Sequence, residues 1–255
     1  MLALKLFVVP LFLGLISLAG KRWGPGFAGW LGGLPVIVGP ILVLLAIEQG
    51  TTFARQTAIY SLAGVASTMV FCVVYARTAR RRTWGHALAA GYGAWCLAAL
   101  VLASLPLNGY IVVPLALGAL WLARHLMPAI SSNAGVRASL PPAELAVRML
   151  AGALLVLLVT AVAAMAGSRI TGVLSLFPVL ASVLAVFLQR GGGADAAIRL
   201  LTGLASGMYS LVAFCASMLL LLDRVPLAPA TGISIALTLV VQAGLRAPAR
   251  HRNSD

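Results

Sequence analysis

The residues of this chain that could carry chemistry lie in two interrupted apolar segments. The first contains Pro35 and then Gly39-Pro40, and the second contains Pro178 followed by Ser182. A proline inside a helix removes a backbone donor and clashes with the preceding turn, so it leaves carbonyl oxygens without helical partners. Paired broken helices are the best sequence indication of a transporter's binding site. The alternative is that the glycines before Pro35 let neighbouring helices pack closely.

Acidic residues are scarce, and none is expected near the centre of a helix. They are Glu48, Glu144, Asp195, Asp223 and Asp255. A proton-coupled pump usually buries a carboxylate in the membrane. Glu48, followed by Gln49 at the end of an apolar run, is the best candidate for such a role, and the alternative is an ordinary interfacial helix end.

Hydroxyl and phenol groups inside apolar helices complete the candidate substrate-binding set. They are Ser67, Tyr92, Tyr209 and Ser210, within a wider polar group that includes Gln56, Tyr60, Thr68, Ser206 and Gln242. Serine and threonine in membrane helices also bond to the backbone or to a neighbouring helix. Arg148 and Arg199, one turn inside their helices, either extend to the membrane interface or bind an anionic group such as a lipid phosphate.

Motifs for enzymatic chemistry are absent from the sequence. It contains no metal-ligand spacing, nucleophile triad, phosphate loop or dinucleotide fingerprint. Cys72, Cys96 and Cys215 all lie in apolar runs, where cysteine behaves as a small apolar residue. We therefore expect neither an enzyme nor a bound metal or cofactor.

The composition is that of a membrane protein. Hydrophobic residues make up 62% of the 255 residues and charged residues 9%, and the mean hydropathy is +1.05. Apolar runs of about 20 residues without a charge predict membrane-spanning helices. The net charge of +13 would suggest a nucleic-acid partner in a soluble protein, but positive residues in short loops set the orientation of a membrane protein. The lipid bilayer is the expected partner, and nucleic acid is not.

The expected fold is an all-α polytopic transmembrane bundle of about nine helices. They cover residues 2–20, 29–47, 53–75, 86–104, 110–126, 145–167, 171–189, 196–222 and 225–245. The first run is long, contains Pro10 and lacks a small-residue cleavage site, so a retained helix is favoured over a signal peptide. The organisation is a first repeat at 1–126, a cytoplasmic linker at 127–142, a second repeat at 143–245 and a basic tail at 246–255.

An internal repeat supports this division into halves. Residues 29–72 align without gaps with residues 172–215, at a constant offset of 143. The 44 aligned pairs include 12 identities, whereas this apolar composition would give roughly 4 by chance. Pro35/Pro178 and Gly50/Gly193 are among the identical pairs.

Charge in the loops predicts the orientation of the two repeats. If 77–82 is cytoplasmic, alternation of the helices brings most other basic residues to the same side. The amino terminus is then outside and the carboxyl terminus inside a bacterial-type inner membrane. Five helices precede the second repeat, so the two repeats are expected to have opposite orientations, as in many secondary transporters.

The second repeat resembles the GlpM-like family. The residues that carry the resemblance are the run 170–178, then Gly193, Ala197, Arg199 and the run Gly207-Met208-Tyr209-Ser210. The resemblance implies small inner-membrane units of about four helices, in a family that its name links to alginate production. The five-plus-four arrangement is also similar to the drug/metabolite transporter superfamily, whose EamA-type members have two inverted five-helix units; this chain lacks a tenth helix.

The predicted function is that of a transporter-like permease for a small metabolite or a lipid-linked precursor. Its site is expected where the segments of Pro35 and Pro178 cross. A polar, water-accessible cavity there would support transport, and a dry, apolar contact would count against it. The alternative is an accessory membrane protein for envelope or exopolysaccharide assembly, in which the duplication only stabilises a bundle.

Overall fold

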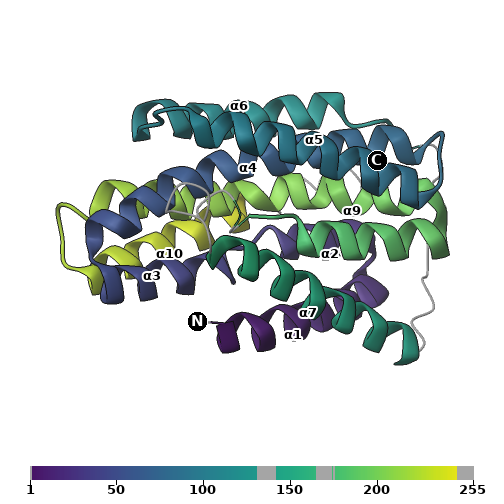
Figure 1. The fold of residues 1–255 in the computed structure, drawn as a ribbon, viewed down its shortest axis with the longest axis horizontal. Coiled ribbons are helices and arrows are strands. Elements are labelled where there is room, and N and C mark those ends of the chain that lie inside the picture. Colours follow the sequence, from purple (N-terminus) through teal and green to yellow (C-terminus); the bar gives the residue numbers. More distant parts are fainter. Residues whose placement is uncertain (1, 131–141, 165–173, 175, 246–255) are drawn as a thin grey trace.

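The computed structural model describes residues 2–130, 142–164, 174 and 176–245, and within them the regular structure is helix, with no strand (Figure 1). The helices are α1 (Leu2–Trp23), α2 (Pro25–Gly32), α3 (Val38–Gln49), α4 (Thr51–Ala79), α5 (Trp84–Ser104), α6 (Gly109–Leu126), α7 (Pro142–Ala164), α9 (Val179–Leu221) and α10 (Leu227–Gly244). Most of the expected linker, the expected tail and residues 171–173 lie outside the described residues.

The described helices have the lengths and composition of membrane spans. Five of them, α4, α5, α6, α9 and α10, are long and apolar enough to cross a membrane. Large apolar side chains such as Leu100, Trp121 and Val240 are more than half exposed on the outer helices. Such faces are unfavourable in water and are expected against lipid. The all-α class and the membrane-protein composition predicted from the sequence are therefore confirmed.

The segment predicted as one interrupted helix over 29–47 is two helices. α2 starts earlier than predicted, because Pro25 is favourable in a first helical turn. Between α2 and α3, residues 33–37 form turns around Pro35, which has no N–H for a helical hydrogen bond. Pro40 is tolerated because it lies in the first turn of α3.

The helices predicted at 171–189 and 196–222 correspond to two limbs of α9, which starts only at Val179 because Pro178 interrupts the first of them. The predicted loop at 190–193 is helical except at Gly193, whose φ of 77° and ψ of −177° reverse the chain. Residues 179–192 form the first limb and residues 194–221 the second, and the limbs run side by side in Figure 1. Gly24 and Gly50 have φ values of 91° and 87° and join α1 to α2 and α3 to α4 in the same way. Other residues rarely adopt this conformation.

α4 lies at the centre of the bundle. Of its apolar stretch 89% is buried, against 22% for α5, α6 and α10. The second limb of α9 lies antiparallel to α4, and an ion pair joins the two at each end. Arg55 pairs with Asp223 at 3.1 Å, and Arg80 pairs with Asp195 at 3.3 Å. The second pair is the less exposed and contributes more, because exposed pairs are worth little.

Backbone contact between α2 and α9 depends on glycines from both helices. A Cβ added at Gly29 would lie 1.8 Å from the Leu200 carbonyl oxygen, and one at Gly33 would lie 2.4 Å from the Gly207 carbonyl carbon. A Cβ at Gly203 would meet the Gly26 oxygen at 2.0 Å. The close-packing interpretation of the glycines therefore holds for Gly29 and Gly33, since small residues let membrane helices approach closely.

The crossing predicts a strong effect of one methyl group. We expect Gly29→Ala to lower stability by about 1–3 kcal/mol, because the added carbon has no space beside the α9 backbone. The matched control is Gly118→Ala on α6, where nothing lies within 4 Å of an added Cβ. Thermal unfolding in neutral detergent measures both variants, and equal midpoints would contradict the crossing.

Candidate functional site

A cavity of about 110 Å³ lies between the two breaks in the helices. Leu34 and Ile37 line it from the first break, and Leu176, Phe177 and Pro178 line it from the second. Other helices line it through Val9, Val38, Ile41, Val156, Val159, Val179, Ala181, Leu204, Met208 and Leu211. The breaks are 143 positions apart in sequence, and the fold brings them to one space.

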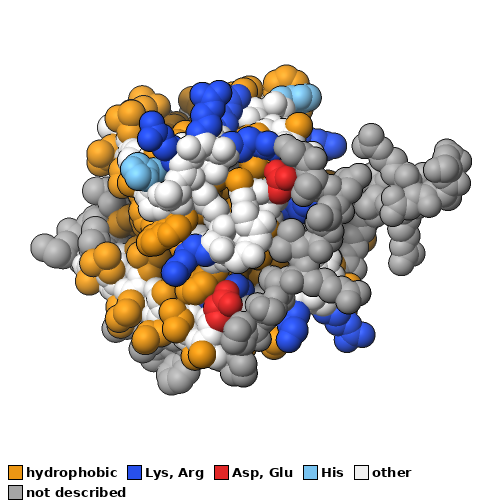
Figure 2. Space-filling view, turned by 90° about the vertical axis from the view of Figure 1, so that its right-hand side faces the viewer, with side chains coloured by type: hydrophobic (Ala, Val, Ile, Leu, Met, Phe, Trp, Pro, Cys, Tyr) orange, Lys and Arg blue, Asp and Glu red, His pale blue; other side chains and the backbone are white. Residues whose placement is uncertain are grey.

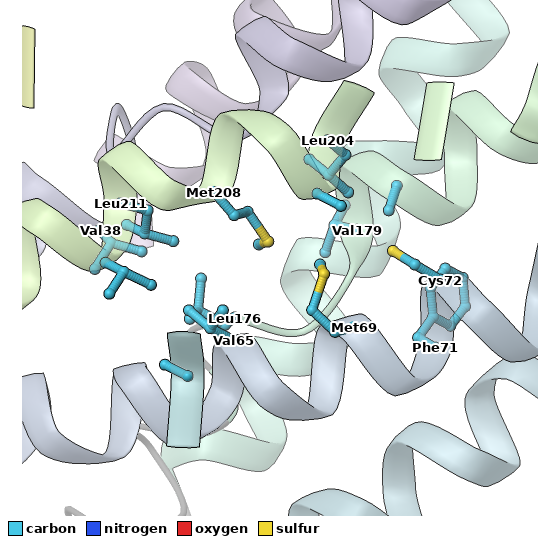
Figure 3. Packing of buried hydrophobic residues seen from close by; sticks show 14 of the residues in the cluster. Val38, Val65, Met69, Phe71, Cys72, Leu176, Val179, Leu204, Met208 and Leu211 are labelled. Carbon is cyan, nitrogen blue, oxygen red and sulfur yellow. The ribbon is translucent and has the colours of Figure 1, made fainter. Parts of the chain in front are cut away.

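The wall of this cavity is apolar. Among the described lining residues, only Thr68 has a polar side chain, and its hydroxyl donates to the Leu176 carbonyl oxygen at 2.8 Å. Figure 3 shows Met208 and Leu204 pointing from α9 towards Val179 and Leu176. The described lining therefore lacks the polar surface that would support transport of a polar metabolite, although the space is not the dry, close-packed contact that would count against transport. The physical reason is that the broken backbone is satisfied locally and aliphatic side chains face inward.

Matching hydrogen bonds follow the two prolines. The Gly39 N–H donates to the Pro35 oxygen and the Ser182 N–H donates to the Pro178 oxygen, each at 2.8 Å. Each proline therefore provides the first acceptor of the helix that follows it. The Leu31 oxygen, four residues before Pro35, accepts from the Leu34 N–H at 3.1 Å.

The predicted residues of the two breaks lie at or beside the cavity. Pro178 lines it, and Pro35 lies between Leu34 and Ile37, which do. Gly39 and Ser182, the next predicted residues of the two segments, are both buried. An added Cβ at Gly39 would touch the Phe214 ring at 3.4 Å, and the Ser182 hydroxyl donates to the Val179 oxygen at 3.0 Å. The last of this group, Pro40, is exposed.

Five predicted residues of the helix interiors and ends do not line the cavity. Ser210 is buried and donates to the Gly207 oxygen of its own helix at 2.7 Å. Ser67 is fully buried, and its hydroxyl has no hydrogen-bond partner among the described residues. Tyr209, which precedes Ser210 in the chain, is half-buried. Glu48 and Gln49 are exposed, about two turns beyond Ile41, the last cavity-lining residue of α3.

Tyr92 belongs to an aromatic cluster behind the cavity. Its ring lies 5.6 Å from that of Phe71 and 5.2 Å from that of Phe177, which lines the cavity. Trp95 packs edge-on against the same Phe177 ring at 4.8 Å. The cluster therefore holds Phe177 in place from the α5 side. Sequence reasoning included Tyr92 and missed Phe177, because nothing in the local pattern distinguishes an aromatic residue at a break from one in a helix.

One end of the bundle is strongly basic. The side chain of Arg77 donates to the Leu126 oxygen at 3.1 Å, and Arg190 lies over the Trp84 ring at 5.6 Å, so several helix ends meet there. The basic residues of this end are Lys21, Arg22, Arg77, Arg80, Arg81, Arg82, Arg124, Arg148, Arg190 and Arg199. Figure 2 looks onto this end and shows many Lys and Arg side chains around few acidic ones.

Within the described ranges, no three His, Cys, Asp or Glu side chains gather where a metal ion could bind. No family model, curated protein or solved structure matches the chain. Function is therefore inferred from the cavity, the breaks and the charge distribution.

The Thr68 hydrogen bond predicts how the second break is held. We expect Thr68→Val to lower stability by about 1–3 kcal/mol, because the buried Leu176 carbonyl would lose the donor that reaches it from α4. Thr57→Val is the control: its hydroxyl donates to the Phe53 oxygen in its own helix, so its loss leaves no break unsupported. Thermal unfolding compares the two, and equal losses would contradict a role for Thr68 at the break.

Proposed function

We propose that this chain is a membrane permease of two inverted halves that moves an amphipathic, lipid-linked substrate. The apolar cavity between the two breaks carries the proposal. A small polar metabolite would lose its hydration there without gaining hydrogen bonds, whereas an alkyl or prenyl chain is favoured in such a space. At about 110 Å³ the cavity is smaller than a whole ligand pocket, so it suits a segment of a chain.

Agreement between the halves supports a duplicated architecture. At the offset of 143, α3 corresponds to the first limb of α9, Gly50 to Gly193, α4 to the second limb and α5 to α10. The hydrogen bonds after Pro35 and Pro178 correspond as well. α1 corresponds to α7, and α6 is left as the connection between the halves.

Reciprocal contacts support an inverted relation between the halves. Gly33, at the first break, packs on Gly207 of the second half, while Leu176, at the second break, accepts from Thr68 of the first. The corresponding helices α4 and the second limb of α9 are antiparallel, as their two end-to-end ion pairs require. Antiparallel copies around a shared central cavity are the build of many secondary transporters.

The basic end favours one orientation in a bacterial-type inner membrane. Positive residues are retained on the cytoplasmic side, so this end is assigned to the cytoplasm. The start of α1 and the end of α9 then face outward, and the chain ends inside. The resemblance to GlpM-like and EamA-type proteins agrees with this proposal and stays a prediction.

Filling the cavity tests the permease proposal. We expect Ala181→Phe to slow translocation about tenfold, because the larger side chain fills the cavity and weakens binding of the substrate's chain. A tenfold loss corresponds to about 1.4 kcal/mol of binding free energy. The assay reconstitutes the chain in vesicles and follows dithionite bleaching of an anionic phospholipid labelled on its headgroup. Ala89→Phe, at an exposed position of α5, is the control and should bleach at the unmodified rate. Bleaching no faster than in protein-free vesicles would contradict the permease and favour the accessory role.

Labelling of single cysteines tests the orientation. In a Cys96→Ser background, which removes the exposed native thiol, Tyr110→Cys should react with an impermeant maleimide in intact cells. Arg81→Cys, at the basic end, should react only after permeabilisation. The reverse pattern would invert the proposed orientation, and labelling of both in intact cells would contradict a span between them.

A further inference from the structure

We propose that Arg148 binds the anionic headgroup, a phosphate ester, of a lipid whose chain occupies the cavity. This inference rests on the proposed function and names the part of the substrate that the cavity cannot hold. It assigns a ligand to an arginine whose side chain is only 3% exposed. Extension to the membrane interface, one of the two alternatives drawn from sequence, does not describe such a buried side chain.

The guanidinium of Arg148 has contacts on several sides, but one of its hydrogen-bond donors has no acceptor among the described residues. Its Nη2 pairs with the Glu144 carboxylate, and its Nη1 makes a long contact of 3.4 Å with the Ser17 hydroxyl. It lies 5.0 Å over the Phe187 ring. Its Nε is buried and has no hydrogen-bond partner among the described residues. A buried charged donor without an acceptor is unfavourable, so the site is incomplete as it stands.

The Nε edge of this guanidinium is buried and has no partner among the described residues, and its chemistry suits an oxyanion with more than one oxygen. Nε and Nη2 present two parallel donors, which match two oxygens of a phosphate in a bidentate arrangement, so a phosphate bound there shares Nη2 with the Glu144 carboxylate. Lys21, exposed and on the same wall, adds a second positive charge. A dianionic phosphate would therefore meet two cations and one carboxylate.

A small crevice of about 10 Å³, room for about one water molecule, adjoins Arg148, and its walls include Ser17, Gly20 and Lys21 of α1, so a phosphate enters only when this wall moves outward. The crevice and the cavity belong to one seam between α1, α2, α7 and the two limbs of α9. On each of these helices the residue that lines the crevice lies nearer the basic end than the residue that lines the cavity. The pairs, cavity residue first, are Val9 and Ile16, Gly32 and Ala28, Val156 and Arg148, Ala181 and Leu184, and Leu204 and Leu200.

The separation fits a single lipid molecule. Eight residues separate Val156 from Arg148 on α7, which is about 12 Å at the helical rise of 1.5 Å per residue. An extended prenyl or acyl chain covers this length easily. The crevice lies at the basic end, where headgroups lie, and the cavity lies deeper among apolar side chains. Along the seam, the positive charge therefore lies where an anionic lipid has its headgroup, and the apolar cavity lies where it has its chain.

Thermal stability in neutral detergent tests the site with three probes: farnesyl phosphate, farnesol and inorganic phosphate. The unmodified chain should be stabilised most by farnesyl phosphate, weakly by farnesol and not measurably by inorganic phosphate. The double variant Arg148→Gln/Glu144→Gln removes both members of the buried pair, so it avoids an unpaired charge. It should fold and lose the farnesyl phosphate shift while keeping the farnesol shift. Arg81→Gln, an exposed arginine at the same end, should keep both shifts.

A single variant distinguishes a phosphate-binding role of Arg148 from a purely structural role of the Arg148–Glu144 ion pair. Glu144→Gln removes the carboxylate that competes for the guanidinium, so farnesyl phosphate should half-saturate at a several-fold lower concentration and give a larger shift. A purely structural pair predicts lower stability with no gain in binding, which would overturn the proposal.

Other outcomes identify which proposal fails. An unchanged farnesyl phosphate shift in the double variant would overturn the headgroup site while leaving the cavity intact. If inorganic phosphate raised the melting temperature as much as farnesyl phosphate does, the bound phosphate would not need to belong to a lipid, and the lipid headgroup assignment would be overturned. If farnesyl phosphate behaves as expected but translocation in vesicles is absent, the permease fails and the headgroup site stands.

Discussion

The contact on which the rest of the structure depends is the backbone crossing of α2 and α9. Gly29 and Gly33 meet Leu200 and Gly207 at distances that leave no space for a side chain. In lipid, apolar side chains gain little by leaving one apolar medium for another, so helix association relies on close packing. Because α2 cannot move away from α9, the break that follows it at 33–37 is fixed beside the second half of the chain.

That fixed break meets its counterpart around a shared space. The second break is held from the other side, where Thr68 of α4 donates to the Leu176 oxygen. Proline interrupts both segments, but the backbone groups that it frees are bonded within a turn. What remains is an unfilled space with aliphatic walls, not a polar one. This distinction moves the proposed substrate from a polar metabolite to a lipid chain.

Charged residues are distributed unevenly along the length of the bundle. The ion pairs Arg55–Asp223 and Arg80–Asp195 close the two ends of the antiparallel central helices. Most of the described basic residues gather at one end, and Arg148 extends that charge inward along the seam that leads to the cavity. A lipid phosphate at Arg148 would join the basic end to the apolar space, so that headgroup recognition and chain binding belong to one pathway.

The sequence by itself determined the helical class, the membrane composition, the prolines at which both segments break and the short stretches in which Gly50 and Gly193 reverse the chain. These are local properties: apolar runs, prolines without N–H groups, and Gly50 and Gly193 in a conformation that other residues rarely adopt. Tertiary structure alone decided which helices meet, because that depends on contacts between residues far apart in the chain. It brought Leu176 to Thr68 and Phe187 to Arg148, and left Glu48 in the open. The sequence therefore predicted where the site would lie, but not that its wall would be apolar. Which side chains face inward depends on how the helices pack.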